Sequence, residues 1–245
     1  MASARINDSL LSRSERAALA ALVRRLPAAA KPDHLTVIGL VGAILTGVGF
    51  AACWWSNAFL AFVVLGLFLN WFGDSLDGTL ARYRGIERPH YGYFVDHSAD
   101  LIAQTLIVVG LGVSPFFTVF SGLLVLSLYL LMSSYTYLRV VTESVHRLSY
   151  GGMGATEFRI LVAGWALLAA WIGPSVVMTR LYSFAAIDVV IGILSALTFL
   201  GFVWIVRNDL SRLQKEARAA EEKHADDAED PVFAGDAHLA DRILR

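Results

Sequence analysis

The chain has 245 residues, of which 56% are hydrophobic and 17% are charged, and its formal net charge is −1. This composition excludes an intrinsically disordered chain, which would be poor in hydrophobic residues and rich in charge. A net charge so close to zero gives no indication of nucleic-acid binding. The single cysteine, Cys53, excludes an internal disulfide bond and a cysteine-based metal site.

Residues 1–34 form a basic N-terminal segment with six basic and three acidic side chains. Ser12 is followed three residues later by Glu15, which is the sequence pattern of a capping box at the start of a helix. Apolar residues then recur at helical spacing up to Pro27, namely Leu19, Leu22, Val23 and Leu26. We expect an amphipathic juxtamembrane helix on the anionic cytoplasmic face of a membrane. The alternative is a surface helix that packs against its own protein.

Six hydrophobic segments follow, and each is close to the ~20 residues that cross the core of a bilayer. We place the six spans at about 35–55, 58–80, 93–113, 116–138, 158–178 and 184–206. The sequence therefore predicts an all-α integral membrane protein whose six-helix membrane domain covers residues 35–206.

The arginines between the spans lie almost entirely on one side of the predicted membrane. The connections after the first, third and fifth spans contain a single arginine, Arg180. The opposite side holds many more, among them Arg82, Arg84, Arg88, Arg139 and Arg147. By the positive-inside rule this side is cytoplasmic, and both termini lie there. The even number of spans agrees with that orientation.

The segment after the last span, residues 207–245, is rich in charge. Its residues 208–245 contain ten acidic and six basic side chains. We expect this tail to begin as a charged helix and to be disordered around the acidic run at 226–230. We expect it to carry no chemistry.

Four carboxylates stand at the cytoplasmic ends of the second and third spans, where an acid is costly and indicates function. Asp74 and Asp77 are three residues apart, and Asp96 and Asp100 are four apart, so each pair shares one helix face. Converging on one point, the four charges would repel one another strongly and would need a cation. Oxygen ligands without histidine or cysteine favour Mg²⁺, Mn²⁺ or Ca²⁺, and Mg²⁺ commonly also binds substrate phosphates.

Small residues accompany these acids. Gly78 follows Asp77, and Gly92 precedes Asp96 by four residues. Glycine at these places lets backbone and ligand approach closely. The guanidinium of Arg82 suits a diphosphate. The alternative, a set of surface ion pairs in a cytoplasmic loop, does not explain four acids in register on apolar helices.

Residues 74–82 and 92–100 resemble the signature of the CDP-alcohol phosphotransferases, DxxDGxxAR followed by GxxxDxxxD. All eight fixed positions of the signature are met, with nine residues between its halves. With the six spans and the juxtamembrane helix, the likeness extends over about residues 10–206, and the acidic tail lies outside it.

The resemblance implies a membrane enzyme of phospholipid synthesis that transfers a substituted phosphate from a CDP-alcohol, most often CDP-diacylglycerol, to a second alcohol and releases CMP. It assigns metal binding, to two Mg²⁺ or Mn²⁺ ions, to Asp74, Asp77, Asp96 and Asp100. It assigns catalysis to Asp96 and Asp100, with Asp100 as the general base. It places Asp74, Gly78, Ala81 and Arg82 at the CDP pocket. It also implies a homodimer, and a bacterial cytoplasmic membrane as the location.

The acceptor alcohol is less clear from the sequence. A phosphorylated acceptor would need cationic side chains, for which the candidates are Arg139, His146, Arg147 and Arg159. The positive-inside rule alone also explains these residues. Glu157 could bind an acceptor hydroxyl or ammonium, pair with an arginine, or favour a helix N-terminus. His97 resembles the choline and ethanolamine branch of the family, but it could equally support the metal site or packing.

Two other classes share part of this pattern. A membrane prenyltransferase also binds a diphosphate through Mg²⁺ and Asp-rich helices, but its two motifs lie far apart in a longer chain. A divalent-cation carrier would place its acids near the middle of the membrane, whereas here they gather at one face. CMP release that depends on Mg²⁺ would distinguish an enzyme from a carrier.

Overall fold

The computed structural model describes the chain except for residues 1–3, 7–10, 144, 148–153, 182 and 230–245. Within the described part, six helices are long and apolar enough to cross a membrane, which confirms the six predicted spans. They are α2 (Pro32–Ala52), α3 (Leu60–Arg84), α4 (Pro89–Gly112), α5 (Val119–Glu143), α6 (Ala155–Ile172) and α8 (Ala186–Glu229). The chain forms two compact units, residues 1–195 and 196–245.

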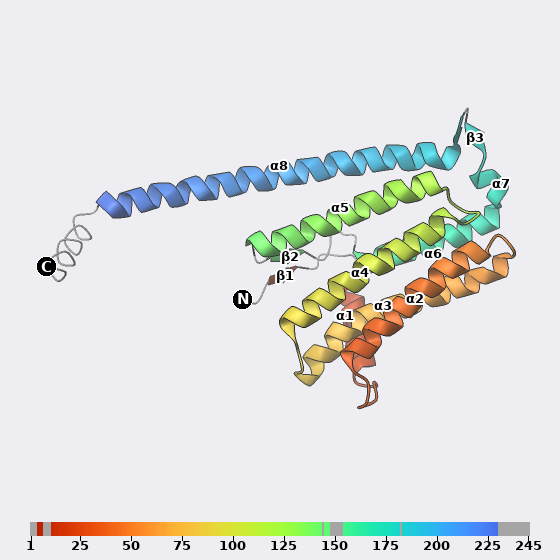
Figure 1. The fold of residues 1–245 in the computed structure, drawn as a ribbon, viewed down its shortest axis with the longest axis horizontal. Helices are drawn as coiled ribbons and strands as arrows, with labels where there is room; N and C mark the ends of the chain where they lie inside the picture. The colour runs from red at the N-terminus through yellow and green to blue at the C-terminus, as the bar shows by residue number, and fades with distance from the viewer. Residues whose placement is uncertain (1–3, 7–10, 144, 148–153, 182, 230–245) are drawn as a thin grey trace. The chain divides into compact units, whose positions relative to one another are not determined.

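Short elements connect these helices. They are β1 (Ala4–Ile6), α1 (Ser12–Val23), the 3-10 helix η1 (Asn57–Phe59), β2 (Val145–Arg147), α7 (Pro174–Val177), β3 (Arg180–Leu181) and β4 (Phe184–Ala185). Strand β1 pairs in parallel with β2, and β3 pairs in antiparallel with β4. The first unit is otherwise helical, with α2 to α6 running side by side (Figure 1).

Glycines let α2 approach α3 and α4 backbone to backbone. A Cβ at Gly42 of α2 would lie 2.5 Å from the amide nitrogen of Asn70 of α3, and one at Gly110 of α4 would lie 2.5 Å from the Cα of Gly47. A Cβ at Gly73 would collide with the carbonyl oxygen of Leu35. Small residues favour such close packing where lipid gives helices no hydrophobic reason to associate. This contact fixes α3, which carries the first half of the acidic motif.

Helix α1 packs on its own protein. Its Val23 is buried together with Leu35, Leu76 and Leu80 from α2 and α3, and Leu19, Leu22 and Leu26 lie against this group. This is the contact that the alternative expected, and the position of α1 on a membrane surface stays a prediction. The predicted capping box is wrong, because Leu11 is the N-cap and Glu15 instead accepts hydrogen bonds from α3 and α6.

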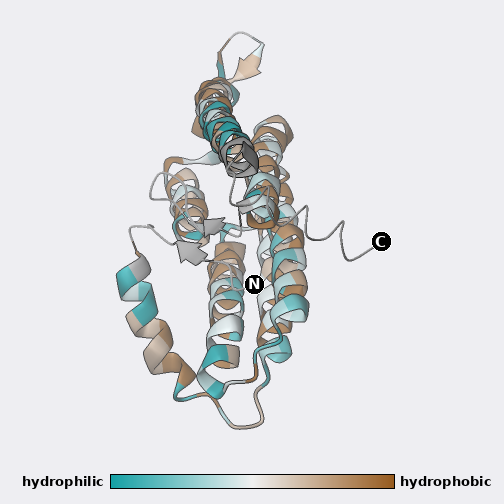
Figure 2. Ribbon diagram, turned by 90° about the vertical axis from the view of Figure 1, so that its left-hand side faces the viewer, coloured by the Kyte–Doolittle hydropathy of each residue, from teal (hydrophilic) through white to brown (hydrophobic). Residues whose placement is uncertain are grey.

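Hydrophobic residues predominate along the long helices of the first unit (Figure 2), and many of their large hydrophobic side chains are exposed. In the second unit, α8 becomes hydrophilic toward its C-terminal end and is helical through Glu229, and the expected disorder of the tail stays a prediction. Alanines favour this helix, and Arg212 pairs with Asp209 at 3.5 Å and Glu216 at 3.2 Å along it. The rest of the expected disordered segment lies outside the described residues.

Candidate active site

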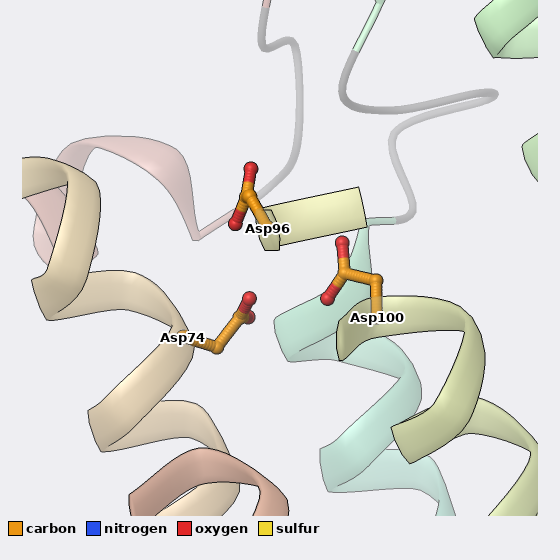
Figure 3. Close-up of side chains that lie close together, drawn as sticks. All are labelled: Asp74, Asp96 and Asp100. Carbon is orange, nitrogen blue, oxygen red and sulfur yellow. The ribbon is translucent and has the colours of Figure 1, made fainter. Parts of the chain in front are cut away.

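Three of the four predicted acids meet at one point (Figure 3). Asp74 comes from α3, and Asp96 and Asp100 come from neighbouring turns of α4. One carboxylate oxygen of each lies within 4.8 Å of the others. The turn between the helices makes this possible: Gly85 takes the left-handed conformation (φ 65°) that ends α3, and Pro89 begins α4.

The fourth acid, Asp77, is turned toward α2. Its carboxylate accepts a hydrogen bond of 2.7 Å from the hydroxyl of Thr36 and another from the backbone amide of Gly78. It still lines the same cavity as Asp74, Asp96 and Asp100, and it is buried. The structure therefore brings together three acids of the expected four, and the metal role of Asp77 stays a prediction.

A buried arginine from α6 joins the acids. Nη2 of Arg159 lies 2.6 Å from Oδ2 of Asp74, and its Nε donates a 2.7 Å hydrogen bond to Oδ1 of Asn70. Asn70 in turn donates through Nδ2 to the carbonyl oxygen of Gly39 at 3.0 Å. Only 9% of Arg159 is exposed. Charge-assisted bonds of this kind hold a guanidinium in one orientation.

Sequence reasoning missed Asn70 and Thr36 as parts of the site. A signal for Asn70 existed, because a polar amide inside an apolar helix needs a partner and often marks function. Thr36 gave no such signal, since a threonine in a helix commonly satisfies its hydroxyl on the preceding turn of its own backbone. Thr36 does bond to the carbonyl of Pro32 at 3.3 Å, but its shorter bond goes to Asp77.

Two connected cavities lie at the acids. The inner one is lined by the four aspartates together with Asn70, Thr36 and apolar neighbours. The outer one is larger and shares Thr36, Asp77 and Asp96 with it. The predicted nucleotide-binding residues Gly78, Ala81 and Arg82 all line the outer cavity, whereas Asp74 lines the inner one.

Glycine at position 78 leaves room for Arg82 on the same helix. A Cβ at Gly78 would lie 3.2 Å from Nη1 of Arg82, so any side chain there would press on the guanidinium. The guanidinium donates a 3.3 Å hydrogen bond to the hydroxyl of Thr79. Arg82 is thereby held along the wall of the outer cavity, where a diphosphate could accept from it.

Two neighbouring arginines, Arg84 and Arg88, hold together the segments near the outer cavity. Arg84 donates to the carbonyl oxygens of Pro27 at 2.8 Å, Ala28 at 3.2 Å and also Ala30, and so holds the loop between α1 and α2. Arg88 pairs with Asp33 at the start of α2. These contacts join the ends of α2, α3 and α4 around the site.

Two further residues predicted to bind the acceptor, His97 and Glu157, contact other groups of the protein. His97 is buried, stacks on Tyr137 with centroids 4.7 Å apart, and meets the ring of Tyr93 edge-on at 4.1 Å. Its Nδ1 lies 3.5 Å from the Asp96 carboxylate. Glu157 accepts from the amide of Gly154 at 3.0 Å, which fits the helix N-terminus alternative.

The other predicted cations lie near the C-terminal end of α5. Arg139 belongs to the last turns of α5 and is partly buried. His146 and Arg147 lie in β2, and their side chains are outside the described part of the chain. The acceptor roles of all these residues remain predictions.

The donor set fits a hard divalent cation. All three clustered ligands are carboxylates, and Arg159 supplies a single positive charge next to one of them. The ligand atoms of Asp74, Asp96 and Asp100 all lie within 4.8 Å of one another. Carboxylates this close are stable only when a proton or a cation offsets their charge. Oxygen ligands of this kind fit Mg²⁺ or Mn²⁺.

Comparison with known proteins gives a consistent result. The family model for CDP-alcohol phosphatidyltransferases matches residues 29–204, which include α2 to α6 and both halves of the acidic motif. An archaetidylinositol phosphate synthase from Methanothermobacter thermautotrophicus is 28% identical over 140 residues, which cover 57% of this chain and 67% of that protein.

Proposed function

The chain belongs to the CDP-alcohol phosphatidyltransferase family, and from this premise we propose that it transfers a phosphatidyl group from CDP-diacylglycerol to a phosphorylated polyol of the inositol phosphate class. Family membership makes the protein an integral membrane transferase of phospholipid synthesis that uses a CDP-linked donor and an alcohol acceptor. Membership also sets aside the prenyltransferase and the cation carrier.

One observation favours a phosphorylated acceptor. The guanidinium of Arg159 is buried beside the acids, and in the described part of the chain its Nη1 has no hydrogen-bond partner. A buried guanidinium with an unused donor is well suited to bind a phosphate oxygen. The name of the relative, a synthase of archaetidylinositol phosphate, supports the same class of acceptor. Arg139 is a second candidate for this phosphate.

The donor fits the outer cavity. We propose that Arg82 binds the diphosphate of the CDP group, and that Gly78 and Ala81 leave space for the nucleotide on the same helix face. Asp77 and Asp96 line both cavities and would lie between donor and acceptor. The lipid tail would remain in the bilayer beside the apolar helices.

The reaction needs one proton transfer. The acceptor oxygen forms a bond to the phosphorus of the phosphatidyl group, and the bond from that phosphorus to the CMP oxygen breaks with its electron pair going to CMP. We assign Asp100 to accept the hydroxyl proton, because it belongs to the carboxylate cluster and lines the inner cavity. Arg159 would orient the acceptor so that its hydroxyl faces this carboxylate.

Metal binding completes the proposal. Asp74, Asp96 and Asp100, with Asp77 beside them, would hold Mg²⁺ or Mn²⁺, and we propose two ions. The metal supplies positive charge that stabilises the diphosphate and the leaving CMP.

The proposal also includes orientation and assembly. We propose that both termini face the cytoplasm of a bacterium and that the enzyme works as a homodimer. The acids lie near the C-terminal end of α3 and the N-terminal end of α4. Basic residues gather at these ends and at the neighbouring start of α2, namely Lys31, Arg82, Arg84 and Arg88, which supports a cytoplasmic site.

The direct test is CMP release by the purified protein in detergent. With CDP-diacylglycerol and Mg²⁺, we expect release with inositol phosphate and much less with inositol, serine, choline or ethanolamine. Faster release with an unphosphorylated acceptor would contradict the assignment of Arg159. EDTA should abolish the reaction.

A further inference from the structure

The carboxylate of Glu15 joins three helices behind the candidate active site. Its Oε1 accepts hydrogen bonds from Nε1 of Trp71 at 2.8 Å, from the hydroxyl of Thr156 at 2.6 Å, and more weakly from Ser75 at 3.4 Å. Glu15 belongs to α1, Trp71 and Ser75 to α3, and Thr156 to α6. Donors from α3 and α6 therefore share one carboxylate oxygen of α1.

These partners are close in sequence to the site residues. Ser75 directly follows Asp74, and Trp71 lies one helical turn before it. Thr156 lies three residues before Arg159, on the same face of α6. The Glu15 contacts thus connect the same two helices that the bond between Arg159 and Asp74 connects within the site.

Two further contacts fix α1 in this place. The backbone amide of Leu11, at the start of α1, donates to Oε1 of Glu157 at 3.0 Å, which ties α1 to the start of α6 a second time. At the other end of α1, Val23 is buried against Leu76 and Leu80 of α3. Helix α1 is therefore held to both α3 and α6 by its first turn and to α3 by its last.

We propose that Glu15 is a positioning residue that sets the spacing of α3 and α6, and thereby places Arg159 beside Asp74 for binding of the acceptor. The proposal rests on the proposed function for its kinetic consequence. Its structural part, that Glu15 ties α1 to α6, stands independently of which reaction the enzyme performs.

The first test is hydrogen–deuterium exchange on the full chain in detergent. Glu15→Ala should raise amide exchange about tenfold in residues 11–23 and 154–160, because the loss of charge-assisted hydrogen bonds frees both segments. Exchange in α4 should not change. Arg13→Ala, an exposed residue of the same turn, is the matched control and should leave all segments as in the wild type. Unchanged exchange in Glu15→Ala would overturn the proposal.

A second variant separates hydrogen bonding from a simple charge effect. An acid in the first turn of a helix is also favourable through the helix dipole, and both Glu15→Gln and Glu15→Ala remove that effect equally. Glutamine keeps an acceptor oxygen, so we expect Glu15→Gln to stay within about threefold of wild-type exchange. Equal effects of the two substitutions would contradict the positioning role.

A double-mutant cycle tests the contact with α6. Thr156→Val removes one donor, and the combination of Glu15→Ala with Thr156→Val should behave like Glu15→Ala alone, because the bond is already lost. If the fold-increases in amide exchange of the two single variants multiply in the double variant, the two residues act independently, and this would contradict the proposal.

The kinetic consequence is a raised KM for the acceptor. In Glu15→Ala we expect an increase of about tenfold with kcat and the KM for CDP-diacylglycerol changed less than threefold. A change confined to kcat would contradict the proposed link to Arg159. If no acceptor supports CMP release in the wild type, the proposed function fails, and the exchange experiment still decides the role of Glu15.

Discussion

Arg159 Nη2 lies 2.6 Å from Oδ2 of Asp74, so a buried cation of α6 is bonded to the first acid of the motif on α3. Asn70 holds the same guanidinium through Nε. The arginine thus connects the proposed acceptor-binding region with the carboxylates proposed to bind metal. This relationship gives the first prediction.

We expect Arg159→Lys to lower kcat/KM about 100-fold for a phosphorylated acceptor, because a compact ammonium lacks the planar spread of donors with which the guanidinium contacts Asn70 and Asp74 and would reach a phosphate. The effect on an unphosphorylated alcohol should be much smaller. CMP release with both acceptors measures the difference. Arg180→Lys, exposed in β3, is the control and should be neutral. A value for Arg159→Lys within twofold of the wild type would remove Arg159 from the acceptor site.

The second prediction concerns the carboxylates. Asp74→Asn, Asp96→Asn and Asp100→Asn should each lower turnover by at least about a thousandfold, since each removes a charge from the metal site and Asp100 also the base. Binding of Mn²⁺, followed by electron paramagnetic resonance, should weaken in all three. Glu216→Gln on α8 is the control for loss of one acid. A variant that keeps a near-normal rate would not be a metal ligand.

Thr36 offers a third test, because its hydroxyl orients Asp77 at 2.7 Å. Partners of this kind commonly change metal affinity by about 10–100-fold. We expect Thr36→Val to need about tenfold more Mg²⁺ for half-maximal CMP release, while Thr36→Ser stays near the wild type. Identical behaviour of the two variants would show that the hydroxyl does not matter and would weaken the case for Asp77 as a ligand.

The glycine contact between α2 and α3 predicts a loss of stability. Gly73→Ala places a methyl group against the carbonyl oxygen of Leu35, and we expect it to destabilise the fold by roughly 1–3 kcal/mol. Gly164→Ala is the matched control, because no atom lies within 4 Å of its added Cβ and alanine favours a helix. Thermal unfolding in detergent, followed by tryptophan fluorescence, compares the two. A Gly73→Ala variant as stable as Gly164→Ala would contradict the close approach.

The orientation can be tested with thiol labelling. The native Cys53 thiol is buried, which keeps background labelling low. In intact cells we expect an impermeant maleimide to label Trp55→Cys but not Glu216→Cys. Permeabilised cells should show labelling at both positions. The reverse pattern in intact cells would invert the proposed topology.

Much of the fold could be predicted from the sequence, because the hydrophobic runs are as long as a bilayer is thick. The meeting of three acids could be predicted too, since a four-residue step places Asp96 and Asp100 on one side of α4, which faces Asp74 of α3. The direction of Asp77 could not, because it depends on a hydroxyl of α2 that is distant in sequence.

The contacts of α1 with other helices could not be predicted from the sequence either. Ser12 and Glu15 match a capping box, but the pattern does not reveal that Trp71 and Thr156 offer stronger partners to this carboxylate. Likewise, the leucines of α1 suit a membrane surface as well as the buried cluster of α2 and α3 residues against which they pack. Local patterns identify the helix, whereas tertiary contacts determine what it binds.

The most direct test of the account is CMP release from CDP-diacylglycerol by wild-type protein, measured with inositol phosphate and with inositol in the presence and absence of EDTA. We predict Mg²⁺-dependent release with inositol phosphate that is at least about tenfold faster than with inositol. Release that is equal with both acceptors would contradict the role of Arg159, and release that persists in EDTA would contradict the metal-dependent site formed by Asp74, Asp96 and Asp100.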